Sequence, residues 1–402
     1  MQFKLATLFL TLSAIFLTMP SYAAPYTPAN DTEMVERLPG RASDPATRRV
    51  ESLRKQLAAR PDDARVRVDI ARRYFDMAMA QGDPRYAGYA AGALAPLLKT
   101  VPNEPAIAAA YYQARGMIEQ FTHAFDPALA SLAKASALNP TSAEPLLWRS
   151  AIFMVQAKYA QAAAECAKLT PLADPLVGVG CTAYAESSHN NGLGTAFEKL
   201  AAAVKVHHKS TPELLLWQYT RLAEMAWRLD RLDIAEEYYK SALKLGITDQ
   251  FLLGSYADLL LFQKRPKEVL VLLADWERSD ILLLRLALAA KQSNDARAAN
   301  LAAQLRTRFR DAARRGDRLH EQEAARFELD IEQNPKQALV LASANYSIQK
   351  EPRDAEILMR AAISAGDAKQ ARPALAWWRE TGYQDPQISQ LAAQLIAQGA
   401  EK

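Results

Sequence analysis

The sequence is poor in the residues that break helices or favour strands. Glycine accounts for 15 of the 402 residues, and runs of β-branched residues, which are typical of sheet cores, are hard to find. Alanine, leucine, arginine, glutamine and glutamate dominate instead, and these residues have high helix propensity. A chain of this length is also long for one compact core. The composition therefore favours an all-helical protein built as two domains or as an array of repeats.

An excess of charge of one sign is also lacking. The formal net charge is +4, far from the strongly basic balance of a general nucleic-acid-binding protein. We therefore expect no nucleic-acid partner. One arginine-rich stretch runs from Arg306 to Arg318. It is either the solvated face of a long helix, balanced by nearby acidic residues, or a docking surface for an acidic partner, and we favour the first interpretation.

Long hydrophobic runs are absent after the first residues. The most apolar later stretch, Ile281 to Ala290, is short and interrupted by an arginine, so we expect no stable membrane insertion. At the N-terminus, Lys4 precedes 15 apolar residues, and Ser21-Tyr22-Ala23 supplies the small residues of a cleavage site. This pattern is typical of a signal peptide over residues 1–23, cut after Ala23. An uncleaved anchor is the alternative, but the apolar run is short for a membrane span. We expect a secreted or periplasmic protein.

Cysteine is nearly absent, with two residues in the whole chain. Cys166 and Cys181 lie symmetrically about a loop at residues 172–175, and in a helical hairpin they would face each other. An exported protein can keep a disulfide. Packed helix axes are about 8–10 Å apart, however, and a disulfide needs Cα atoms within about 7 Å. Two interpretations stay open: a disulfide, or two small buried residues in contact.

Short motifs that carry catalysis are missing too. There is no phosphate-binding GK[ST] loop and no GxSxG nucleophile turn. The zinc-protease pattern that begins at His320 fails at Ala324, where a second histidine is required. The glycines at 178–180 have no preceding strand to form a dinucleotide-binding turn. Adjacent His207 and His208 point about 100° apart on a helix, which serves one ion poorly. We therefore expect a protein that is not an enzyme, with no catalytic residue, metal or cofactor.

What the sequence does contain is a repeated helical pattern. After a proline-rich lead-in at residues 24–45, residues 46–402 alternate helical runs with short breaks. The breaks carry proline, which is tolerated in the first turn of a helix but not inside one. A small residue followed four positions later by a second apolar residue recurs from positions 128, 162, 196, 235, 269, 299, 338 and 371. The commonest separation is 34 residues, which an ordinary helical bundle does not show.

These units resemble tetratricopeptide repeats, in which two antiparallel helices occupy about 34 residues. Residues 109–142 carry the pattern well, with Tyr112 and Gly116 on the first helix and Ala128 and Ala135 on the second. The resemblance covers roughly residues 64–385. It implies an all-α, right-handed α–α superhelix of roughly eight to ten helix hairpins. A capping helix at residues 387–397 is expected to close the array.

In this family the first helix of each pair lines a concave groove that binds ligands. Trp217 and Trp227 are nearly three turns apart on one helix. With Phe251, Phe262 and Arg228 they would form an aromatic groove that anchors a carboxylate. The alternative is that either tryptophan packs between helices. The groove residues that the resemblance implies are Met117, Trp217, Thr220, Glu224, Trp227, Arg228, Phe251, Asp258, Phe262 and Arg360.

The sequence thus favours a non-catalytic exported scaffold or adaptor that binds a protein or peptide partner in its concave groove. The alternative is a small-molecule or glycan-binding helical accessory subunit of an envelope enzyme or transport system. A third, weaker interpretation is a noncatalytic metal-binding protein that uses the histidines. The aromatic content of the groove positions favours the first two.

Overall fold

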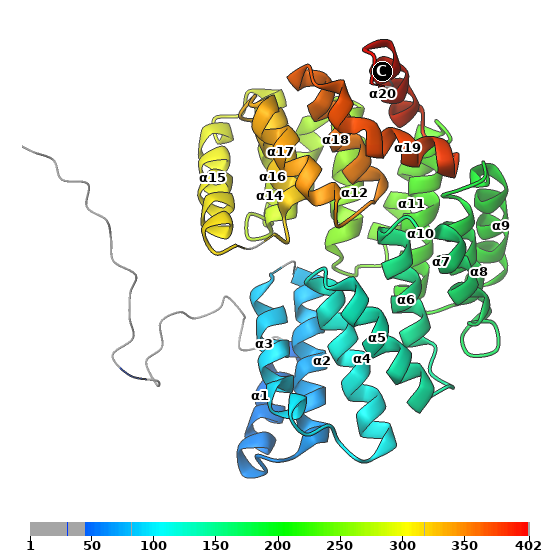
Figure 1. Ribbon diagram of the computed structural model, residues 1–402, viewed down its shortest axis with the longest axis vertical. Helices are drawn as coiled ribbons and strands as arrows, with labels where there is room; N and C mark the ends of the chain where they lie inside the picture. The colour runs from blue at the N-terminus through cyan, green and yellow to red at the C-terminus, as the bar shows by residue number, and fades with distance from the viewer. Residues whose placement is uncertain (1–29, 31–44, 82, 317, 401–402) are drawn as a thin grey trace, which may run out of the picture.

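The computed structural model describes residues 30, 45–81, 83–316 and 318–400. The expected signal peptide at 1–23 and nearly all of the lead-in at 24–45 lie outside these residues. Regular structure in the described part is entirely helical (Figure 1). Its elements are α1 (Pro45–Ala59), α2 (Ala64–Gln81), α3 (Arg85–Leu94), η1 (Ala95–Leu98), α4 (Pro105–Phe121), α5 (Phe125–Leu138), α6 (Glu144–Val155), α7 (Tyr159–Ala167), α8 (Pro175–Glu186), α9 (Leu193–Val206), α10 (Pro212–Arg228), α11 (Leu232–Leu243), α12 (Gln250–Phe262), α13 (Pro266–Leu272), α14 (Asp280–Ser293), α15 (Ala298–Arg314), α16 (Glu321–Asp330), α17 (Pro335–Tyr346), α18 (Pro352–Ala365), η2 (Ala368–Ala371), α19 (Arg372–Thr381) and α20 (Pro386–Ala397).

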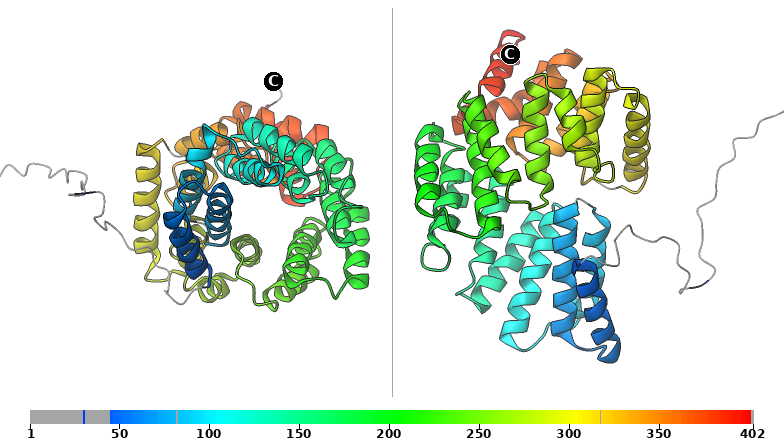
Figure 2. Two further views of the ribbon diagram at one scale, coloured as in Figure 1. Left: turned by 90° about the horizontal axis from the view of Figure 1, so that it is seen from below. Right: turned by 180° about the vertical axis from the view of Figure 1, so that it is seen from behind.

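The helices form consecutive antiparallel pairs, each packed on the next along the chain. Within the described residues nine pairs run from α2 and α3 to α18 and α19, with α1 before the first and α20 after the last. Figure 2 shows that the pairs wind around a central axis. The fold is therefore an all-α superhelix of tetratricopeptide-type hairpins, which confirms the fold class expected from the sequence. Among the described residues, no helix combines the length and apolar character needed to cross a bilayer.

A left-handed backbone residue ends the first helix in eight of these pairs. Such a residue stops a helix and reverses the chain direction. One of them is a glycine, so the scarcity of glycine did not remove this turn type. These residues recur at nearly the same spacing as the small-residue pattern, which makes the tight turn part of the repeat. With φ between 55° and 71°, they are His123, Ala157, Asn190, Asn191, Asp230, Lys264, Asn294, Gln333 and Gly366.

The small residues of the repeated pattern lie between helices. Ala235, Tyr239 and Ala242 on α11 are fully buried, as are the equivalent positions on α5. Small residues let two helices approach closely, and a larger residue between them fills the remaining space. At Gly116 on α4 an added Cβ would lie 2.7 Å from Cγ of Leu132 on α5, so a larger residue there would force the pair apart. The pattern thus marks packing positions, as the sequence predicts.

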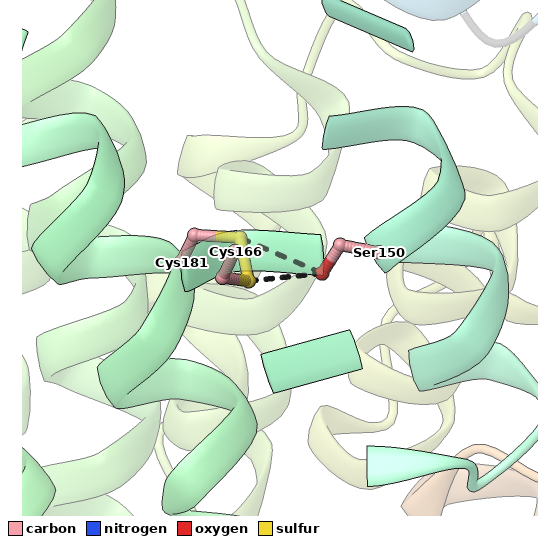
Figure 3. The surroundings of a disulfide bond; sticks show 3 residues. All are labelled: Ser150, Cys166 and Cys181. Atoms are coloured by element: carbon pink, nitrogen blue, oxygen red, sulfur yellow. Dashed lines mark hydrogen bonds between the residues drawn. A yellow bond between two sulfur atoms is a disulfide. The ribbon is translucent and has the colours of Figure 1, made fainter. Parts of the chain in front are cut away.

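Cys166 on α7 and Cys181 on α8 form a disulfide in the structure (Figure 3). Their Cα atoms are 5.4 Å apart, closer than packed helix axes usually are, so the first of the two interpretations holds. Ser150 Oγ lies 3.1 Å from Cys166 Sγ and 3.5 Å from Cys181 Sγ. Because a disulfide sulfur carries no proton, the serine hydroxyl is the donor in this contact.

The superhelix winds far enough for late pairs to contact early ones. The link between α17 and α18 meets the turn that follows α6, and the link between α19 and α20 meets the turn between α8 and α9. The N-terminal end of α12, at Gln250, contacts α2 in the same way. Hydrogen bonds across this seam include Lys350 N to Val155 O at 2.7 Å, Asn190 N to Thr381 O at 2.8 Å, Gln250 Nε2 to Met79 O at 3.2 Å and Trp377 Nε1 to Tyr159 Oη at 3.1 Å. The array is therefore closed on itself and not an open spiral.

The glycines at 178–180 and the arginine-rich stretch both make contacts within the fold. Residues 178–180 lie inside α8, where an added Cβ on Gly180 would fall 2.0 Å from Oε1 of Gln218, so this glycine permits close helix packing. The arginine-rich stretch lies on and after α15. There Arg306 pairs with Glu332 at 2.7 Å and Arg308 with Asp280 at 2.8 Å. Nearby acidic residues thus neutralise part of that face.

Candidate functional site

A cavity of about 850 Å³ lies on the concave face of the superhelix. Its wall comes from the first helices of six successive pairs, α8, α10, α12, α14, α16 and α18. The segment from Tyr383 through α20 closes the remaining side. Because the superhelix turns these helices toward one axis, residues that are far apart in the sequence share one chamber.

Seven of the ten residues that the sequence assigns to the groove line this cavity. They come from α10, α12 and α18 and are Glu224, Trp227, Arg228, Phe251, Asp258, Phe262 and Arg360. The fold thus brings these seven residues together around one cavity. Their role in binding stays a prediction.

The other three residues lie elsewhere. Trp217 packs against the cluster around the disulfide, and the guanidinium of Arg221 lies 4.2 Å from the centre of its ring. Thr220 is buried, and its hydroxyl donates to Leu216 O at 2.9 Å. Met117 is buried in the core between α2 and α4. These three residues do not line the cavity: Met117 and Thr220 are buried, and Trp217 is partly buried.

Aromatic side chains form one wall of the cavity. The rings of Trp227 and Phe262 have centroids 5.6 Å apart. Phe251 and Phe262 are 50% and 42% exposed, although large aromatic side chains are usually buried. Exposed aromatic surface inside a hollow is typical of a binding site.

Asp258 lies on α12 with Phe251 and Phe262 and is the centre of a charge network in the cavity wall. Its carboxylate contacts Arg285 at 2.8 Å, Arg326 at 2.7 Å and Arg353 at 3.1 Å. Burial alone would raise the pKa of Asp258, but the three guanidinium groups outweigh it and hold that pKa well below its usual range. Arg326 also approaches Asp330 at 3.6 Å, so a second acid, on α16, shares this group of arginines. Arg360 belongs to the edge of the same network, since it pairs with Asp330 and approaches Glu356 at 3.6 Å.

Arg228 does not offer a free guanidinium for a ligand carboxylate, which corrects the expected anchor. Its Nη2 donates to Ser187 O at 2.6 Å, its Nη1 to Ser187 Oγ at 3.3 Å, and its Nε to Gln384 O at 3.1 Å. The guanidinium also lies 3.9 Å from the centre of the Tyr383 ring. All three nitrogens are therefore engaged in holding the segment before α20 against the turn after α8.

Among the described residues, no group of three or more histidine, cysteine, aspartate or glutamate side chains is arranged to hold an ion. The ring of His189 stacks on that of Tyr159 with centroids 6.2 Å apart, and His208 Nδ1 lies 3.1 Å from Lys205 O. Both have structural contacts.

Sequence reasoning missed several cavity residues. Arg285 seemed only to interrupt an apolar run, yet it is buried beside Asp258. Glu351 and Asp385 are the N-cap residues of α18 and α20, and each precedes a proline. The available signal was this acid–proline pair at a helix start, which indicates a cap but not a cavity.

The comparisons with known proteins concern the fold. No protein-family model and no curated protein matches the chain. Similar solved structures include yeast Tom70, at 13% identity and a TM-score of 0.41, covering 89% of this chain and 86% of that one. A human IFIT1 dimer with PPP-AAAA has 12% identity and a TM-score of 0.42, covering 89% and 87%. The APC/C hetero-tetramer Cut9–Hcn1 has 13% identity and a TM-score of 0.38, covering 79% of this chain and 52% of that chain, so this protein spans about half its length.

The arrangement of its own helices makes this chain a tetratricopeptide-type helical-repeat protein with a chamber on its concave face.

Proposed function

We propose that the protein binds a protein or peptide partner in its concave cavity and acts as an exported, non-catalytic scaffold or adaptor. The observation that carries this proposal is the hollow of about 850 Å³ lined by the first helices of six successive pairs. Such a surface runs continuously along the superhelix and suits an extended segment of chain.

The charge and aromatic groups of the cavity support the same conclusion. The arginines around Asp258 are already ordered by ion pairs, so little side-chain entropy is lost when a ligand enters. The exposed rings of Phe251 and Phe262 supply the apolar contact area that dominates most peptide interfaces.

A peptide-selection experiment tests this function. The chain from Ala24 is used to select ligands from a random peptide library, and the affinity of each ligand is measured by calorimetry. The double variant Phe251→Ala and Phe262→Ala should weaken binding at least tenfold, because two exposed rings leave the wall. Both side chains are partly solvent-exposed, so the variant should keep its helical circular dichroism.

Val271→Ala is the matched control, since Val271 lies on α13, is 80% exposed and does not line the cavity. Equal binding by the double variant and the wild type would sink the assignment to this cavity.

The alternative function has one observation in its favour. A volume of about 850 Å³ falls in the range of small-molecule pockets, about 300–1,000 Å³. Such a ligand would make the protein a small-molecule or glycan-binding accessory subunit. A thermal-shift screen of a glycan and metabolite library distinguishes peptide binding from small-molecule binding. Ligands found in that screen, with none found in the peptide library, would favour the alternative function.

The compartment is part of the proposal. The apolar segment at residues 5–19 supports export, and a disulfide between Cys166 and Cys181 suits an oxidising compartment. We therefore place the mature protein in the periplasm or outside the cell.

A further inference from the structure

Three carboxylates from three separate elements line one end of the cavity. Glu224 lies on α10, Glu351 caps α18, and Asp385 caps α20. Among the described residues, none of them forms an ion pair with a lysine, arginine or histidine. The cavity's other carboxylates do, since Asp258, Asp330 and Glu356 contact arginines and Glu323 approaches His320 at 3.8 Å.

The nearest arginines are already engaged. The nitrogens of Arg228 donate to neutral oxygens of Ser187 and Gln384. Arg353 gives one Nη to Asp258 at 3.1 Å and the other to Ser255 Oγ at 2.9 Å. Neither arginine forms an ion pair with any of the three carboxylates, because these nitrogens already contact other oxygens.

The electrostatic state of the three groups agrees with this geometry. Burial raises the pKa of Glu351 and of Asp385. The charge of Arg353 opposes this rise in the pKa of Glu351, and Arg228 and two backbone N–H groups oppose it in the pKa of Asp385, while the charge of Glu224 raises both. Like charges are therefore close enough to oppose one another across this end of the cavity.

Tyr383 adds a phenol hydroxyl to the lining of the same cavity. Tyr383 lines the cavity and is 4% exposed, and its hydroxyl makes no hydrogen bond to any described residue. By contrast, the hydroxyl of Tyr184 donates to both oxygens of Glu224, at 3.1 and 3.0 Å. The Tyr383 oxygen is not among the fully buried unpaired atoms, so it can accept a hydrogen bond from a ligand in the cavity.

We propose that this acidic end of the cavity binds a cationic nitrogen, the ammonium or guanidinium group of a lysine or arginine side chain on the peptide partner. An ammonium group has three N–H donors and a guanidinium has five, which matches three carboxylates and a phenol oxygen. Trp227 lies three residues after Glu224 on the same face of α10, so the hydrocarbon stem of the ligand side chain lies along the aromatic wall. This inference rests on the proposed function, because it names the chemistry of the same ligand.

The test uses heptapeptide libraries that differ only at the central residue, which is lysine, arginine, norleucine or glutamate. Binding to the chain from Ala24 is measured by fluorescence anisotropy. The lysine and arginine libraries should bind at least tenfold more tightly than the other two. Glu224→Gln and Asp385→Asn should remove that preference, and Asn at position 385 still caps α20.

Glu237→Gln, an exposed carboxylate on α11, is the matched control and should leave the preference intact. Equally tight binding by the norleucine or glutamate library would overturn the cation site and leave peptide binding in place. Failure of all four libraries together with no binding of 1,5-diaminopentane would overturn both proposals. If 1,5-diaminopentane binds in a Glu224-dependent manner while no peptide does, the cation site stands and the peptide partner is wrong.

Discussion

At the scale of single residues, Asp258 shows how much depends on one side chain. Three arginines meet its carboxylate, and one of them, Arg285, is buried on α14. A buried arginine without a counter-ion is costly, because its charge leaves water and gains no partner. Asp258 therefore makes the convergence of α12, α14, α16 and α18 electrostatically possible.

Asp258→Asn should destabilise the protein by about 3–5 kcal/mol, since it leaves the three guanidinium groups without their common carboxylate. The pKa of Asp258 is held below its ordinary value, so its contribution is present above about pH 3.8 and is lost as the pH falls through the depressed pKa. Thermal and urea unfolding at pH 7 and near pH 3 should show a difference between variant and wild type that narrows in acid.

Asp311→Asn is the control for that comparison. Asp311 is 43% exposed and lies 3.6 and 3.9 Å from Arg310 and Arg314, so its loss should cost at most about 1 kcal/mol. Equal stability of the two variants at pH 7 would show that the arginine cluster does not need its central acid.

Residue positions were partly predictable from the sequence. Asp258, Trp227 and Phe262 were expected on the groove side because repeat positions fix which face of a first helix points inward. Met117 follows the same rule but is buried in the core, since burial there depends on how tightly neighbouring pairs pack. Arg285 was missed because its partner lies 27 residues earlier on another helix, and single-sequence patterns do not pair such residues.

At the scale of helices, the repeat accounts for the pairs and their turns, and the disulfide adds a covalent tie. Cys166 and Cys181 are separated by 15 residues and join α7 to α8. The 34-residue spacing predicted the pairing of helices, since it is a property of the local chain. It left the disulfide open because the Cα separation depends on the exact approach of α7 and α8.

Removing this disulfide in the double variant Cys166→Ala and Cys181→Ala should lower stability by about 3 kcal/mol, the cost associated with a loop of this length. The variant should melt at a lower temperature than the wild type in a calorimetric scan. Ser150→Ala, which only removes the hydroxyl beside the sulfurs, is the control and should change the melting temperature less.

One mass measurement checks both the export of the protein and the disulfide between α7 and α8. Intact-mass spectrometry of the secreted or periplasmic protein should give the mass of the chain from Ala24 less two hydrogen atoms. A mass that includes Met1 would contradict the proposed compartment. Two thiols that react in the unfolded protein would contradict the disulfide.

At the scale of the whole molecule, the closed seam decides the shape of the cavity. A tetratricopeptide-type array could leave its concave face open, yet here α20 and the segment before it cover one side. The sequence did not predict this closure. Its contacts join segments that are over 150 residues apart in the sequence, such as Arg228 at the end of α10 and Gln384 in the link before α20. The links between helices carry no periodic signal in the sequence.

Arg228 tests whether the seam is held by side chains or by backbone contacts alone. The variant Arg228→Met keeps the hydrocarbon stem and removes the donors to Ser187 and Gln384. A hydrogen bond to a charged group contributes roughly 1.5–3 kcal/mol, so amide exchange in residues 381–390 should accelerate by roughly 10- to 100-fold. Exchange within α12 should stay unchanged, because that helix lies outside the loosened contact.

Arg231→Met is the matched control, since Arg231 pairs only with exposed Glu198, at 3.1 Å, and its ring contact is with Phe197. Hydrogen exchange followed by mass spectrometry compares the two variants over the same peptides. If the segment before α20 exchanges at the wild-type rate in Arg228→Met, backbone contacts such as Asn190 N to Thr381 O hold the seam. If it exchanges faster and peptide binding weakens in parallel, closure by Arg228 and the shape of the cavity are linked, because the same segment forms the cavity wall.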